Sequence, residues 1–180
     1  GVRRLIADAA SIVEIGGQDS KTIRLAPNGT VRDFGMNDRC AAGTGRLLEM
    51  VAVRLEVDLD ELGDLARASR SPAAISSMCV MFAETEIVGL LASGVPREDI
   101  VAGVQQAIAQ RVAALAGHDL AAPVCFTGGV ASVPGMADAL SIALGQAVAV
   151  APSPHFTGAL GAALLAAGAH QGRPGMAGNV

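Results

Sequence analysis

The feature that most constrains the fold is the order in which strand and helix patterns follow one another along the chain. Three short β-branched runs come first, at residues 11–16, 21–26 and 31–34, and glycine-containing turns join them. Such runs predict an antiparallel meander. Apolar residues at helical spacing follow between Gly43 and Gly117, and two strand–helix pairs come after them. This order predicts an α/β fold in which a mixed sheet packs against helices.

The helices and the last two strands can be placed from the spacing of apolar residues and from residues that typically begin or end a helix. Asp58 is a candidate helix cap, and Gly94 and Gly117 are candidate helix ends. We expect the alanine-rich last helix to be packed in the core, residues 1–171 to form one unit and residues 172–180 to be a loose tail. The predicted helices are 43–55, 59–65, 83–93, 100–115, 134–144 and 157–169, and the later strands are 124–127 and 147–151.

Composition limits the classes of function. The chain has 180 residues, of which 51% are hydrophobic and 17% charged, so it is long and apolar enough for a globular domain. It contains no uncharged apolar run of about 18 residues, which argues against a membrane span. The net charge of -4 and 2% aromatic residues argue against a nucleic-acid partner. Three cysteines without a signal peptide indicate a reducing compartment, and we expect a cytoplasmic protein.

Two glycine turns are candidates for ligand contact. The segment EIGGQDSK, residues 14–21, places Gly16 and Gly17 between two strands, where backbone N–H groups can face phosphate oxygens. An ordinary hairpin turn is the alternative. The segment FTGGVA, residues 126–131, places Gly128 and Gly129 at the end of a strand that leads into a helix. Ligands bind at such strand ends, although glycine pairs of this kind are common.

Cysteines mark a second kind of candidate site. Cys40 lies in a segment that opens a predicted helix, and Cys79 lies just before another. A helix N-terminus favours the thiolate, whereas free cysteines are more often small buried hydrophobes, as we expect for Cys125. Two thiolates cannot complete a four-ligand iron–sulfur or zinc site, but two symmetric chains would supply four. For His118, His155 and His170 we expect surface or capping roles.

Five segments together carry a resemblance to a known family. They are EIGGQDSK, NDRCAAGTGRLLE, SMCVMFAETE, CFTGGVA and PHFTGALGAALLA, within residues 1–169. In this order they resemble the BadF/BadG/BcrA/BcrD ATPase family. That family comprises the activators of 2-hydroxyacyl-CoA dehydratases and the ATPase subunits of benzoyl-CoA reductase. The pattern NDRCAAGTG with a cysteine downstream, before FAE, is the most specific part of the match.

The resemblance implies an actin-like fold, an ATP-dependent low-potential electron donor to a CoA-thioester dehydratase or reductase, and a ferredoxin or flavodoxin as electron source. It further implies ATP or ADP with Mg²⁺, and one 4Fe-4S cluster shared with a second copy or a paralogous subunit. Cys40 and Cys79 match the cluster ligands. The catalytic positions that it implies are Glu14 and Gln18, and the nucleotide-contacting positions are Gly16, Gly17, Gly43, Thr44, Gly45, Gly128 and Gly129.

Two differences from the family pattern affect what we expect of the magnesium contact and of the length of the protein. Glu14 stands where the family usually has aspartate, so a water-mediated contact to magnesium would reach one methylene further. The first phosphate motif, a DxGST-type hairpin, is absent, and the chain begins with Gly1 rather than methionine. We therefore expect the C-terminal half of a larger protein. A phosphotransferase of the same fold and a nucleotide-dependent chaperone module are the alternatives, and neither would need the two cysteines.

Overall fold

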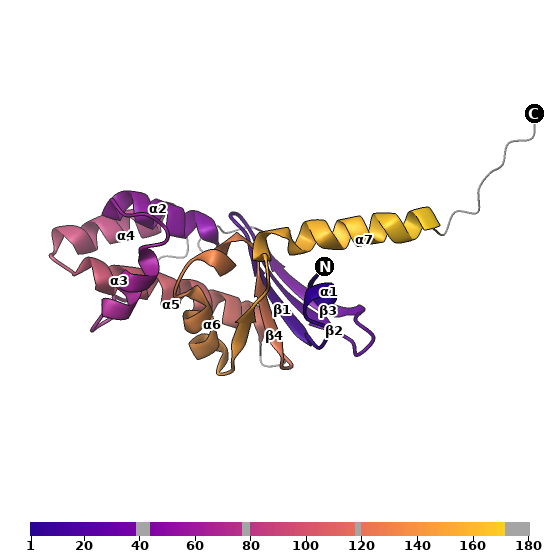
Figure 1. Cartoon of the computed structure of the whole chain (residues 1–180). Helices are drawn as coiled ribbons and strands as arrows, with labels where there is room; N and C mark the ends of the chain where they lie inside the picture. Colours follow the sequence, from indigo (N-terminus) through magenta and orange to yellow (C-terminus); the bar gives the residue numbers. More distant parts are fainter. Residues whose placement is uncertain (39–43, 77–79, 118–119, 172–180) are drawn as a thin grey trace, which may run out of the picture.

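The computed structural model describes residues 1–38, 44–76, 80–117 and 120–171 (Figure 1). Its sheet has the strand order β3-β2-β1-β4-β5. The first three strands, β1 (Ser11–Ile15), β2 (Ser20–Leu25) and β3 (Val31–Asn37), pair antiparallel in sequence order. β4 (Val124–Thr127) runs parallel to β1, and β5 (Val148–Val150) runs parallel to β4. The predicted meander and the mixed sheet are thus confirmed.

The helices lie on both faces of this sheet, with most of them on one side (Figure 1). α5 and α6 cover one face, α2 packs on α5 beyond them, and α1 lies on the opposite face. Two 3₁₀ turns, η2 and η3, follow β4 and β5. The bounds are α1 (Val2–Leu5), α2 (Gly45–Leu55), α3 (Leu62–Ala68), α4 (Val80–Ala92), α5 (Arg97–Ala116), η2 (Gly129–Ser132), α6 (Met136–Leu144), η3 (Pro154–Phe156) and α7 (Thr157–Gln171).

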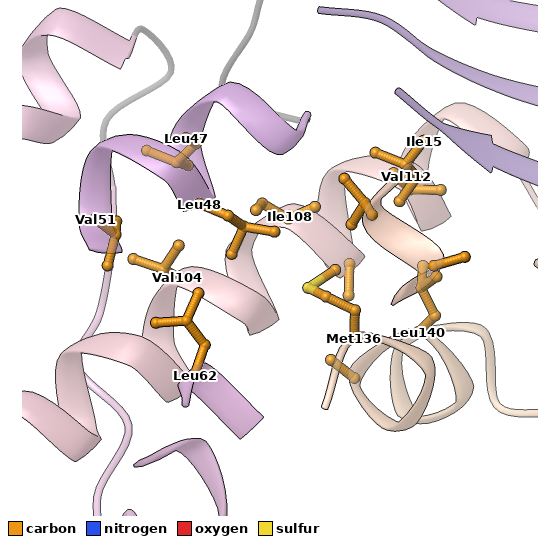
Figure 2. Packing of buried hydrophobic residues seen from close by; sticks show 14 of the residues in the cluster. Ile15, Leu47, Leu48, Val51, Leu62, Val104, Ile108, Val112, Met136 and Leu140 are labelled. Atoms are coloured by element: carbon orange, nitrogen blue, oxygen red, sulfur yellow. The ribbon is translucent and has the colours of Figure 1, made fainter. Parts of the chain in front are cut away.

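Alternation along the strands divides the core in two. Val13, Ile15 and Phe126 are fully buried against the helical side, because every second side chain of a strand points to the same face. Ile12 and Cys125 point to the other face and pack with Val2 of α1. Figure 2 shows the larger cluster, in which side chains of α2, α5 and α6 meet those of β1. This packing holds the start of α2 near the carboxyl ends of β1 and β4.

Some predicted boundaries were wrong. α4 begins at Val80, three residues before the predicted start at residue 83. The helix expected after Asp58 begins only at Leu62, and the Asp58 N–H donates instead to Glu61 Oε2 at 2.7 Å within a lead-in turn. α1 was missed, because four residues are too few to show a helical period.

The expectation for the last helix was also wrong. α7 extends away from the sheet and the other helices (Figure 1), and Leu165 is 77% exposed. Alanine favours helix strongly but is too small to indicate what the helix packs against, so the pattern predicted the element and not its environment. Within the described ranges, no helix combines the length and the apolar character needed to cross a membrane. Residues 172–180 lie outside the described residues.

Candidate functional site

Glycine turns meet at the carboxyl ends of β1 and β4. β1 continues into Gly16 and Gly17, and the parallel register pairs Glu14 with Thr127, so the Gly128 turn lies beside them. The first turn of α2 joins this group, since the Gly45 N–H donates to the Gly16 carbonyl at 2.9 Å. The elements that the sequence predicted to contact a ligand are therefore neighbours in the fold, although they lie far apart in the chain.

Thr44 and Gly45 fix the shape of the Gly16–Gly17 turn. The buried Thr44 Oγ1 donates to the Gly17 carbonyl at 2.9 Å, and the Arg46 N–H donates to the same oxygen at 3.0 Å. A Cβ on Gly45 would lie 3.0 Å from Val130 Cγ2 and 3.3 Å from the Gly16 carbonyl, so only glycine fits without displacement. These α2 donors hold the turn itself, and in this arrangement they are not directed at a ligand.

The two glycines after β4 have different structural roles. Gly128 has a φ of +90°, and a Cβ there would lie 2.3 Å from the Ile15 carbonyl, so glycine is required. Its N–H donates to the Pro154 carbonyl at 3.1 Å. Gly129 is exposed, and a Cβ there would make only an ordinary contact, 3.7 Å from His155 Nδ1. Gly128 therefore builds the turn, whereas Gly129 leaves open space beside it.

A cavity of about 250 Å³ lies between these turns. Its walls are mainly apolar, and the carboxylate of Glu49 can make a polar contact with a ligand. This combination of apolar surface and few polar groups suits a nucleoside, whose base is flat and whose ribose carries hydroxyls. The lining residues are Gly17, Gly45, Leu48, Glu49, Leu59, Gly129, Val130, Val133 and His155.

The side chain of His155 contributes to this cavity. Its Nε2 lies 2.8 Å from Ser132 Oγ, and its ring lines the cavity. His155 is exposed, which agrees with the surface or capping role expected from the sequence, but its place beside the glycine turns was not predicted. A signal was available, because His155 follows β5, and β5 runs parallel to β4 and ends at the same edge of the sheet.

Charged side chains cluster on the strand side of the Gly16 turn. Lys21 Nζ lies 2.8 Å from Glu14 Oε2 and 2.6 Å from Asp19 Oδ2. Partial burial lowers the pKa of Lys21, but its hydrogen bonds to Asp19 and Glu14 and their charges outweigh burial, so the pKa is raised overall. Lys21 therefore stays protonated at neutral pH. Gln18, by contrast, is exposed in this turn.

The predicted metal ligands Cys40 and Cys79, together with Gly43, lie outside the described residues. α2 begins at Gly45, five positions after Cys40, whereas α4 begins directly after Cys79. In the part of the chain that is described, no three His, Cys, Asp or Glu residues are grouped for a metal ion.

Cys125 lies in the core as expected. It is 1% exposed between β1 and β5, and burial raises the pKa of its thiol to about 11. A thiol that is neutral and enclosed at neutral pH is neither a nucleophile nor a metal ligand.

Several known proteins are similar to this chain over most of its length. The activator of lactoyl-CoA dehydratase from Anaerotignum propionicum is 47% identical over 92% of this chain and 64% of its own length. The activator of the 2-hydroxyisocaproyl-CoA dehydratase from Clostridium difficile, solved with bound ADPNP, superposes with a TM-score of 0.88 at 38% identity, over 98% of this chain and 68% of that one. Component A of the Acidaminococcus fermentans (R)-2-hydroxyglutaryl-CoA dehydratase gives a TM-score of 0.85 at 41% identity, over 91% and 63%.

The chain thus spans slightly less than two thirds of the length of the curated relatives that it matches. Its fold is that of the actin-like ATPases, as predicted. The model of the BadF/BadG/BcrA/BcrD ATPase family matches residues 1–166. The converging glycine turns and this match lead to one conclusion: the chain belongs to the BadF/BadG/BcrA/BcrD ATPase family.

Proposed function

We propose that this protein is an ATP-dependent activator that delivers a low-potential electron to a CoA-thioester dehydratase or reductase. One observation supports the proposal most strongly. The chain is 47% identical to a dehydratase activator over 92% of its length, and this span includes the residues that line the cavity. A ferredoxin or flavodoxin is the proposed electron source, and the protein is proposed to act in the cytoplasm. Residues 1–171 are proposed to work as one ATPase unit.

The nucleotide is proposed to lie across the glycine turns. The Gly16–Gly17 turn faces the phosphates, and Glu14 and Gln18 act at this end, with Glu14 contacting Mg²⁺ through water. Gly43, Thr44 and Gly45 belong to the ribose and phosphate side, where Thr44 and Gly45 hold the turn. The base and ribose occupy the cavity beside Gly129 and His155. The fit is supported by the missing β-carbons at Gly17 and Gly129, next to which the structure has open space or ordinary contacts.

Cys40 and Cys79 are proposed to hold one 4Fe-4S cluster together with the same cysteines of a second copy or a paralogous subunit. When bound, such a cluster supplies one-electron redox chemistry. Met81 and Phe82, in the first turn of α4 directly after Cys79, are 76% and 70% exposed. Large apolar side chains exposed together are suited to an interface, which supports a second chain at this end of the molecule.

The described residues offer a physical connection between the two proposed sites. The Gly16 and Gly17 carbonyls accept hydrogen bonds from the first turn of α2. At the other end of α2, the Arg54 guanidinium forms an ion pair with Glu84 of α4. A shift of the phosphate turn would therefore move α2, and α2 would move the helix that follows Cys79.

Anaerobic purification followed by iron and sulfide analysis and a visible spectrum tests the proposed function. One four-iron cluster shared by two chains predicts about two iron and two sulfide per chain. Protein that is free of iron under these conditions, and that still binds ATP, would contradict the electron-transfer role. That result would favour a phosphotransferase or a chaperone-like module.

A further inference from the structure

Lys21 lies on β2 beside the Gly16–Gly17 turn and takes no part in the nucleotide contacts proposed above. It faces Glu14 across the β1–β2 pair and reaches both neighbouring carboxylates. It binds one oxygen of each, Glu14 Oε2 and Asp19 Oδ2. The other two oxygens are turned toward Gly16, since a Cβ there would lie 2.9 Å from Asp19 Oδ1 and 3.9 Å from Glu14 Oε1. Lys21 thus holds the outer oxygens while the inner oxygens face the turn.

The charge of this group matters because the side chains are partly shielded from water. Lys21, Glu14 and Asp19 are 26%, 30% and 32% exposed. Two carboxylates alone carry a charge of -2, and the ammonium reduces the total to -1. Two unpaired carboxylates at one glycine turn would attract a divalent cation, because oxygen ligands and negative charge are what Mg²⁺ and Mn²⁺ prefer. The ammonium repels a cation that approaches the same oxygens.

We propose that Lys21 prevents a divalent cation from binding at Glu14 without a nucleotide, so that the metal enters only together with the phosphates. This inference rests on the proposed contact of Glu14 with Mg²⁺. A cation that arrives with a nucleotide brings anionic phosphate ligands of its own, so it does not need both carboxylates. A bare cation would need both, and Lys21 already binds them. Lys21 is therefore a residue that determines specificity, and it does not take part in the chemistry.

Titration with Mn²⁺ in the absence of nucleotide, followed by EPR of the free ion, tests this role. Lys21→Met removes the positive charge and keeps most of the side-chain volume. We expect it to bind Mn²⁺ about tenfold more tightly than the wild-type protein, because removing one charge a few ångströms from a doubly charged ion has an effect of this size. Lys21→Arg keeps the charge and should behave like the wild type.

A second substitution tests whether the increase in Mn²⁺ affinity depends on the Glu14 carboxylate. Glu14→Gln combined with Lys21→Met should return the Mn²⁺ affinity to the wild-type value, because one of the two carboxylates is then neutral. Lys21→Gln is measured in parallel and should show the same gain as Lys21→Met, so the test does not depend on the folding of one variant. Folded Lys21→Met and Lys21→Gln proteins that bind Mn²⁺ no more tightly than the wild type would overturn the inference.

The result of the Mn²⁺ titration does not depend on whether the proposed function is correct. The Mn²⁺ titration contains no nucleotide and no iron, whereas the proposed function is tested by iron content and ATP binding. A purely structural role for Lys21 predicts a lower melting temperature in Lys21→Met without any change in Mn²⁺ affinity. That pattern would also contradict the inference, while leaving the proposed function intact.

Discussion

Replacement of Gly128 by alanine is expected to lower the free energy of unfolding by roughly 3 kcal/mol. The backbone there has φ +90° and ψ 174°, a region that is essentially restricted to glycine. A Cβ would also lie 2.3 Å from the Ile15 carbonyl of the neighbouring strand, which cannot move without disturbing the β1–β4 pairing. Chemical denaturation monitored by circular dichroism measures the loss.

The adjacent glycine provides the matched control. Gly129→Ala should leave stability nearly unchanged, since its Cβ would make an ordinary contact with His155 at 3.7 Å. Gly129→Val should fold as well but should lose nucleotide binding, because the larger side chain occupies the cavity beside His155. Calorimetry with a non-hydrolysable ATP analogue on the complete protein measures this. If Gly129→Val bound the analogue as tightly as the wild type, the nucleoside would not lie in this cavity.

Replacement of Cys40 or Cys79 by serine is expected to remove the iron from anaerobically purified protein. In a dimer of two identical chains, the four-iron cluster would lose two of its four thiolate ligands with either change, and beside a paralogous subunit it would lose one. Iron analysis by inductively coupled plasma spectrometry, with the visible spectrum, measures the loss.

Cys125→Ser is the matched control for these variants. It changes the same atom type at a buried position in β4, so it should reduce stability while retaining the iron. Stoichiometric iron in both Cys40→Ser and Cys79→Ser, combined with its loss in Cys125→Ser, would show that the ligand assignment is wrong.

Local patterns predicted the fold to the extent that neighbouring residues determine it. Short β-branched runs with glycine turns predicted the meander, because strand pairing across a short turn depends on nearby residues. The apolar strand at residues 124–127 predicted a buried position, and Cys125 and Phe126 are indeed buried. The glycine pairs predicted the turns for a physical reason that the structure shows at Gly128, where only glycine avoids a backbone clash.

What the sequence could not predict depends on contacts between distant segments. The contact of His155 with Gly129 depends on the parallel placement of β4 and β5, for which the order of strand and helix is only an indirect signal. The same holds for the hydrogen bonds from α2 to the Gly16 turn. The exposure of α7 was missed because its alanine and glycine residues are equally compatible with a core helix and an exposed one.

Nucleotide binding is proposed to change the redox properties of the protein through α2 and α4. ATP and ADP can shift a potential only by the difference in their affinity for the two conformations, and such a coupling is typically ~1–3 kcal/mol. Because about 59 mV accompanies each tenfold change in the equilibrium constant of a one-electron couple, the expected shift is on the order of tens to a hundred millivolts.

A redox titration of the complete, iron-loaded protein followed by EPR is the most direct test. It compares the protein with ADP and with a non-hydrolysable ATP analogue under otherwise equal conditions. We expect midpoint potentials that differ by tens of millivolts or more between the two nucleotides. Identical midpoints, with unchanged electron transfer to the partner enzyme, would contradict this expectation.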